Sequence, residues 1–184
     1  MEPTLKDIIQ WGVVIGASLV AAIMDIRTRR IPNLLCGPLF LAGLMWSAWH
    51  GGAYGFVEAL AAAVLMALPF VLLFILAGGG AGDAKLAGAI GAWLSIREAV
   101  IALACIGIAG GILGIIVAIY KRRLKIVFAK MALPVWEWLV AILYHVGYKQ
   151  AIESTRAIDG EKLTVPYGVA IFVGVCVAGG IVLL

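Results

Sequence analysis

The sequence contains few charged residues. Asp, Glu, Lys and Arg together make up 13% of its 184 residues, which is about half the share of an ordinary soluble domain. Hydrophobic residues account for 64%, and the mean hydropathy is +1.11. This composition excludes a water-soluble globular domain. It indicates an integral membrane protein in contact with the lipid bilayer, for which we expect no nucleic-acid partner.

Residues that commonly bind metals are also scarce. The three cysteines, Cys36, Cys105 and Cys176, are isolated in apolar surroundings and have no Cys-x-x-Cys spacing, so no zinc site is implied. The two histidines, His50 and His145, are too few and too scattered for a metal centre. We therefore expect no metal.

The glycine-rich segment 78–82 does not match a nucleotide-binding loop. A Walker A loop ends in Gly-Lys-Ser/Thr, whereas Gly82 is followed by Asp83. A dinucleotide fingerprint follows a β-strand, whereas an apolar helical stretch precedes these glycines. We therefore expect no nucleotide cofactor.

Long uncharged stretches predict how the chain crosses the membrane. A spanning helix needs about 20 apolar residues. Five stretches meet or approach that length, and a sixth must borrow residues at its ends; in chain order they are 8–24, 31–57, 59–82, 86–96, 99–120 and 163–184. No basic region precedes the first stretch, so we expect it to be retained rather than cleaved as a signal peptide. We predict an all-α polytopic bundle of about six transmembrane helices in one domain, residues 1–184.

The positions of the basic residues predict the orientation of this bundle. With the N-terminus outside, segments 25–33, 78–85 and 121–162 face the cytoplasm and hold all the Lys and Arg residues except Lys6 and Arg97. Loops rich in Lys and Arg favour the cytoplasmic side of a membrane. We therefore predict a multi-pass protein of the inner (cytoplasmic) membrane with its N-terminus outside.

Segment 121–162 begins with a basic run and continues with an apolar stretch that is rich in Trp but too short to cross the bilayer. We interpret it as an interfacial cytoplasmic helix. A substrate-recognition loop is the alternative interpretation.

Two aspartates lie where membrane spans are expected to end. Asp25 closes the first uncharged stretch, and Asp83 follows the third, so both are predicted at the cytoplasmic boundary. Ionisable residues at such positions are rare and suggest function. A pair of neighbouring carboxylates can share a proton and activate water. The glycines before Asp83 remove side chains, which would let a substrate backbone come close.

Each aspartate also has a structural interpretation. Asp83 could be the N-cap of a helix that starts at Ala84. Asp25 lies one helical turn from Arg29, so an ion pair could satisfy it, and Pro32 is expected to break this helix. A proton- or ion-coupled transporter that uses Asp25 and Asp83 as a relay is an alternative function, and a non-catalytic assembly subunit is another.

Three motifs stand out in the sequence: Asp25 with Arg29-Arg30-Ile31-Pro32-Asn33, then Gly80-Ala81-Gly82-Asp83-Ala84-Lys85-Leu86, and Pro166-Tyr167-Gly168 near the last span. Together they resemble the motifs of the prepilin peptidases, the type IV leader peptidase family of Gly-x-Gly-Asp membrane aspartic proteases. The resemblance implies that Asp25 and Asp83 are the catalytic pair. The residues that support the motifs are Arg29, Pro32, Asn33, Gly80, Gly82, Lys85, Pro166, Tyr167 and Gly168.

The resemblance also implies the reaction. Members of the family remove a short leader from type IV pilin-like precursors at the cytoplasmic membrane face, without a cofactor. The chain is similar to the compact form of Tad/Flp pilus systems or of archaeal preflagellin processing. It lacks the insert with paired Cys-x-x-Cys motifs that longer members carry, so we expect no N-methyltransferase activity. The presenilin-like proteases match less well, because Met24 rather than Tyr precedes Asp25.

Overall fold

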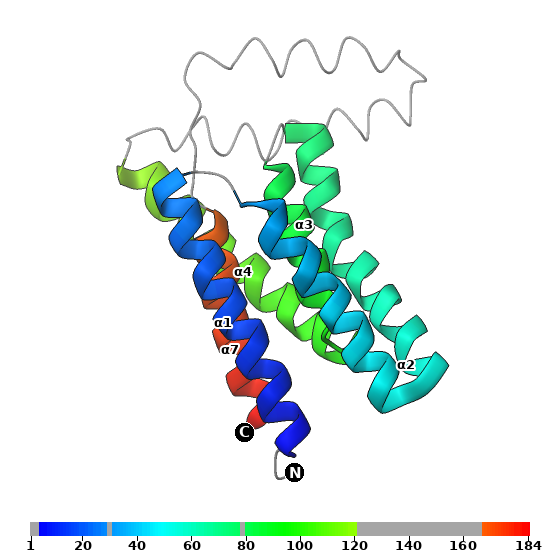
Figure 1. Ribbon diagram of the computed structural model, residues 1–184. Coiled ribbons are helices and arrows are strands. Elements are labelled where there is room, and N and C mark those ends of the chain that lie inside the picture. Colours follow the sequence, from blue (N-terminus) through cyan, green and yellow to red (C-terminus); the bar gives the residue numbers. More distant parts are fainter. Residues whose placement is uncertain (1–3, 29–30, 78–79, 121–166) are drawn as a thin grey trace, which may run out of the picture.

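The computed structural model describes residues 4–28, 31–77, 80–120 and 167–184, and the helices in them form a bundle (Figure 1). In chain order the helices are α1 (Leu5–Thr28), α2 (Asn33–Ala77), α3 (Ala81–Gly91), α4 (Ile96–Tyr120) and α7 (Tyr167–Leu183). The predictions made for segment 121–162, Arg29 and Pro166 lie outside the described residues.

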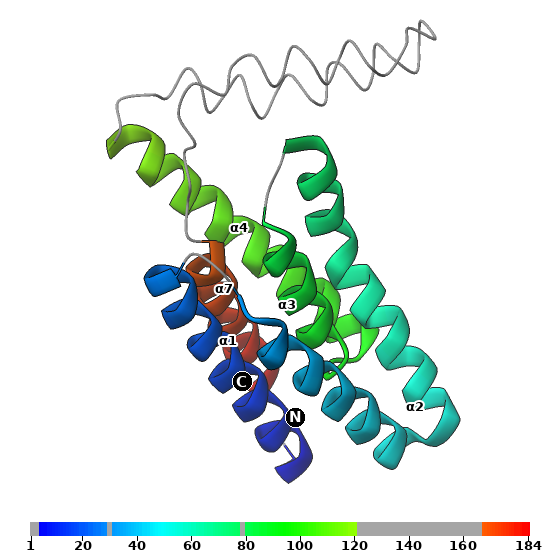
Figure 2. The ribbon, with the colours of Figure 1, turned by 45° about the horizontal axis from the view of Figure 1, so that its top comes forward.

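The helices pack as two groups that share one apolar core. α7 packs against both α1 and α4, while α3 packs against α2 (Figures 1 and 2). α4 also contacts α2 and so links the groups. Trp11 of α1, Leu86 of α3 and Ile171 of α7 are fully buried in the common core. The all-α prediction is confirmed for the described residues.

α2 consists of two helical arms joined at Gly52. Gly52 has φ 60° and ψ −146°, a conformation that glycine adopts much more readily than other residues. The uncharged stretches placed the boundary between two spans at Glu58, and this placement is wrong because the helix continues through Glu58. The Glu58 carboxylate accepts a hydrogen bond of 3.3 Å from the Ile96 N–H. This bond gives the carboxylate a polar partner, so Glu58 can lie within an apolar helix.

α3 is much shorter than a membrane span. Its 11 residues form a helix about 16 Å long, whereas the hydrocarbon core is about 30 Å thick. The stretch 86–96 is therefore not a span by itself. The helix ends at Gly91, and the chain then turns inside the bundle, where Ala92, Trp93 and Leu94 are buried.

The buried turn after α3 is stable because its polar groups have partners. Backbone groups away from water must find hydrogen bonds within the protein. The Ala92 carbonyl accepts a bond of 3.2 Å from the Ser47 hydroxyl, and the Trp93 indole N–H donates to the Leu39 carbonyl over 2.8 Å. Both partners belong to the first arm of α2, which therefore fixes where α3 ends.

α4 begins with a capping box that also holds α1. The Ser95 N–H and hydroxyl both donate to the Glu98 carboxylate, over 2.8 and 2.7 Å, the arrangement that satisfies free N–H groups at a helix start. The same carboxylate accepts bonds from the Gln10 amide and the Trp11 indole of α1, over 3.2 and 3.4 Å. Glu98 thus ties two helices together inside the bundle.

Within the described part of the chain, the helices long and apolar enough to cross a membrane are Leu5–Thr28, Asn33–Ile75 and Ile96–Val117, and α7 is a shorter apolar helix. These helices support a membrane protein but do not confirm six separate spans. In Figure 1 the end of α1 and the starts of α3 and α7 lie together, and both termini lie at the opposite end. We call the end of the bundle that holds the end of α1 and the starts of α3 and α7 the aspartate end, because it carries Asp25 and Asp83.

Gly91 allows the backbones of α2 and α3 to touch. A Cβ at this position would lie 2.7 Å from the Ala62 carbonyl oxygen and 2.8 Å from the Ala63 Cα. We expect Gly91→Ala to destabilise the fold by about 1–3 kcal/mol, because backbone atoms must move apart. Thermal unfolding in detergent measures the effect. The control is Gly12→Ala, whose Cβ meets nothing within 4 Å; equal melting temperatures for both variants would contradict the packing.

Candidate active site

Asp25 is held by the first turn of a helix far away in the sequence. It lies near the end of α1 and is 9% exposed. The backbone N–H of Gly168, the second residue of α7, donates a hydrogen bond of 2.9 Å to its Oδ2. The first N–H groups of a helix have no acceptor within that helix, and a carboxylate is favoured near this end. Asp25 therefore caps α7 from a neighbouring helix.

Gly168 provides more than its N–H. A Cβ on this residue would lie 2.9 Å from the Asp25 Cβ and 3.1 Å from its Oδ2, closer than a real side chain tolerates. The lack of a side chain thus lets α7 approach the carboxylate. The sequence motif included Gly168 but did not predict its contact with Asp25. The feature that could have indicated a hydrogen bond here is the position of Gly168 in the first turn of an apolar helix, where the backbone N–H has no acceptor within the helix.

Asp83 is not an N-cap, so that structural interpretation is wrong. α3 starts at Ala81, its N-cap is Gly80, and no side chain caps it. Asp83 is the third residue of the helix, and its own N–H bonds to the Gly80 carbonyl over 3.2 Å. The helix starts earlier than expected because glycine and alanine can form its first turn. The Asp83 carboxyl is therefore not used to complete α3.

The glycines around Asp83 leave room for its carboxyl group and for the chain that follows α1. A Cβ on Gly80 would lie 2.9 Å from the Asp83 Oδ2, and a Cβ on Gly82 would lie 3.2 Å from the Ile31 Cβ. Gly80 and Ala81 are exposed. The backbone just before Asp83 is thus both uncrowded and accessible.

The two carboxyl groups interact electrostatically. Burial raises the pKa of Asp83 to about 6, and the nearby Asp25 charge contributes to the rise. Tyr167, next to Gly168, lies within electrostatic range of Asp83. Its ring makes an edge contact with Phe70 of α2, with centroids 5.9 Å apart. The site therefore combines residues from α1, α2, α3 and α7.

Two other motif residues meet at the aspartate end. The Lys85 ammonium donates a hydrogen bond of 2.9 Å to the Asn33 Oδ1, joining α3 to the start of α2. Pro32 precedes α2, and its carbonyl accepts the Leu35 N–H over 3.1 Å, so it lies at a helix start after the break that follows α1.

Across residues 4–28, 31–77, 80–120 and 167–184, no group of three or more His, Cys, Asp or Glu is placed to hold a metal ion.

The fold and the two interacting carboxyls define a helical membrane protein with an acidic site in which Asp25 is buried and Asp83 is partly buried. A profile of the type IV leader peptidase family matches residues 12–115, more than half of the 184-residue chain. The match includes the motifs of Asp25 and Asp83 and ends before Pro166-Tyr167-Gly168. The chain belongs to this family, so the family resemblance is confirmed and the protein is a leader-peptidase-like protease. This favours a protease over a transporter. No curated protein and no solved structure matches the chain.

The contact between Gly168 and Asp25 predicts a sensitive position for activity. Gly168→Ala must displace Asp25, because the new Cβ would lie 2.9 Å from the Asp25 Cβ, and a displacement of about 1 Å can lower a catalytic rate about 100-fold. We expect a lower kcat in a peptidase assay. The control is Gly180→Ala on the same helix, where a Cβ meets nothing within 4 Å. Equal activity of the two variants would show that the contact does not position Asp25.

Proposed function

We propose that the protein is an aspartic endopeptidase that removes the leader of type IV pilin-like precursors, such as prepilins, Flp-type pilins or preflagellins. The observation that carries the proposal is the electrostatic coupling of Asp83 to Asp25 at the aspartate end of a type IV leader peptidase. Paired carboxyls of this kind can share a proton, which is the arrangement that aspartic proteases use.

The surroundings of the two carboxyls suggest different roles. Asp25 accepts the Gly168 N–H, which orients its carboxylate for taking a proton from water. Asp83 holds its proton to higher pH than an ordinary carboxyl, because burial raises its pKa to about 6. In the proposed reaction, water attacks the scissile carbonyl carbon and gives a proton to Asp25. Asp83 donates its proton toward the carbonyl oxygen. The C–N bond then breaks, and the leaving amine receives the proton from Asp25. The carbonyl re-forms as one hydroxyl of the intermediate returns a proton to Asp83.

The proposed orientation places this chemistry at the cytoplasmic face of the inner membrane. The charge bias of the sequence assigns the segments that flank Asp25 and Asp83 to the cytoplasm. The end of α1 and the start of α3, which carry these residues, lie at one end of the bundle (Figure 1). A precursor whose apolar helix lies in the bilayer would present its leader at this end. We further propose that the protein cleaves without methylating the new N-terminus.

Replacement of either carboxyl tests the proposal directly. We expect Asp25→Asn and Asp83→Asn each to slow cleavage of a co-expressed pilin-like precursor by at least about 100-fold, because proton transfer is lost. A gel shift of the precursor measures cleavage. Membrane fractionation and a melting curve provide the control for folding. Processing by either well-folded variant at the wild-type rate would exclude the paired-aspartate mechanism.

The protonated state of Asp83 predicts how activity depends on pH. A carboxyl with a raised pKa keeps its proton at higher pH and loses it as the pH rises through that pKa. Because the pKa of Asp83 is raised to about 6, we expect kcat/KM to fall about tenfold per pH unit well above this value. Initial rates in detergent from about pH 5 to about pH 8 measure the profile. Recovery of the rate on return to pH 6 provides the control, and a rate that increases throughout would contradict the assignment.

A further inference from the structure

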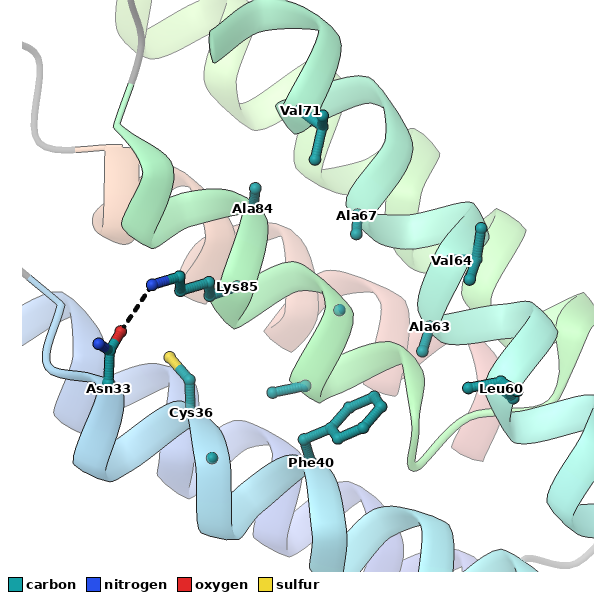
Figure 3. A pocket seen from close by; sticks show the side chains of 13 residues that line it. Asn33, Cys36, Phe40, Leu60, Ala63, Val64, Ala67, Val71, Ala84 and Lys85 are labelled. Carbon is teal, nitrogen blue, oxygen red and sulfur yellow. Dashed lines mark hydrogen bonds between the residues drawn. The ribbon is translucent and has the colours of Figure 1, made fainter.

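An open apolar groove lies beside the candidate active site. It has a volume of about 520 Å³ and lies between α3 and the two arms of α2. Figure 3 shows Cys36 and Phe40 on the first arm, with Val64, Ala67 and Val71 on the second. Hydrocarbon and small side chains form almost all of its lining. Lys85 and Asn33, bonded over 2.9 Å, provide polar groups at the aspartate end. We call this cavity the α2–α3 groove.

The α2–α3 groove adjoins the site at the start of α3, although Asp25, Asp83 and Gly168 themselves do not line it. Ala84 and Lys85, which directly follow Asp83, are both part of its wall, and so is Gly88 one turn later. α3 therefore carries a candidate catalytic carboxyl at its first turn and the floor of the groove in the next. A chain lying in the groove would therefore end beside the first turn of α3, which carries Asp83.

The groove has the size and access needed for a helix face. Its volume of about 520 Å³ is several times that of a cavity that holds benzene, about 150 Å³. From Leu60 to Val71 its wall extends about 16 Å along the second arm, which is three helical turns. Gly37 and Val64 are exposed, so the groove opens on the outer side of the bundle, from which a membrane helix can enter.

We propose that the α2–α3 groove is the docking site for the apolar transmembrane helix of the precursor, and that this docking delivers the cleavage site to Asp83. The inference rests on the proposed function. It adds a binding surface for the mature part of the substrate, separate from the carboxyls that cut the leader. Small residues in the walls, such as Ala67, Ala84 and Gly88, allow a helix backbone to come close.

A lipid chain is the other occupant that such a groove could hold. A lipid would be bound equally with or without substrate, and it would have no connection to the position of the cut. The end of the groove at Ala84, the residue directly after Asp83, favours the substrate helix. If the substrate helix occupies the groove, groove variants should impair cleavage of the full precursor but not of a short peptide without the helix. If a lipid occupies it, both substrates should be affected alike.

The first experiment narrows the groove. A Cβ on Gly37 meets nothing within 4 Å, so Gly37→Leu fills the groove without displacing the backbone. Gly12→Leu is the matched control, because Gly12 is also exposed and its Cβ also meets nothing within 4 Å. We expect Gly37→Leu to raise KM for the full precursor about tenfold with little change in kcat, whereas Gly12→Leu leaves both values unchanged. Melting curves of both variants check the fold.

A second pair of variants and a second substrate identify the occupant. Val64→Trp in the groove is matched by Val100→Trp on α4, since these valines are 58% and 51% exposed. A short peptide that holds the leader and the cut but lacks the apolar helix should be cleaved equally by all variants. If the groove variants cleave the peptide and the precursor more slowly by the same factor, the proposal is overturned. Such a result would indicate an effect on the enzyme itself, such as the loss of a bound lipid. Unchanged cleavage of the precursor by both groove variants would also overturn it.

A cross-link tests docking without catalysis. Cys36 lines the groove, and the other cysteines, Cys105 and Cys176, can be replaced by Ala. In Asp83→Asn protein, a precursor with one cysteine in its apolar helix should form a disulfide with Cys36 under mild oxidation, and Gly37→Leu should reduce the yield. Absence of this disulfide along the whole apolar helix would overturn the proposal. Failure of the wild type to cleave, with the cross-link present, would instead contradict the proposed function alone.

Discussion

The hydrogen bond from the Gly168 N–H to Asp25 is the interaction on which the aspartate end of the bundle depends. A carboxylate inside an apolar bundle is costly unless fixed dipoles replace its water. The first turn of α7 supplies such a dipole, 2.9 Å from the Asp25 Oδ2. The distance is maintained because α1 and α7 pack along their length, where Gly179 lies against the Trp11 ring. The stability of this helix pair therefore also determines the geometry of the site.

The second carboxyl comes from the other group of helices. α3 is held mainly by α2 and makes few contacts with α1 or α7. The separation of Asp25 and Asp83 thus depends on how the two groups pack, rather than on one rigid element. Tyr167 links the groups near the site, because its ring contacts Phe70 of α2 at an interplanar angle of 80° and also lies against Gly110 of α4. A bulky aromatic residue beside the carboxyls is therefore part of what brings them together.

Much of the site could be predicted because charge is rare in this chain. Asp25 and Asp83 stand out against long apolar stretches, and their shared end of the bundle follows from counting spans. The break in α2 could not be predicted from charge, since Glu58 finds a partner in the Ile96 N–H. The end of α3 at Gly91 could not be predicted either, because Ser47 and Leu39, which form hydrogen bonds with the buried turn after it, are distant in the sequence. Tertiary hydrogen bonds thus allow Glu58 to lie within a helix and α3 to end inside the bundle, whereas the break itself lies at Gly52.

The packing of α3 changes along its length in a way that connects the turn, the groove and the site. Toward its end the contacts are tight: Gly91 touches the backbone of the second arm, and Gly43 of the first arm lies against the Trp93 ring. Toward its start, Ala84 and Gly88 are too small to fill the space between the arms, and the groove opens. The groove, where we propose that the substrate helix docks, thus reaches the turn of α3 that carries Asp83. The small residues of α3 allow close packing at one end and leave the groove open at the other.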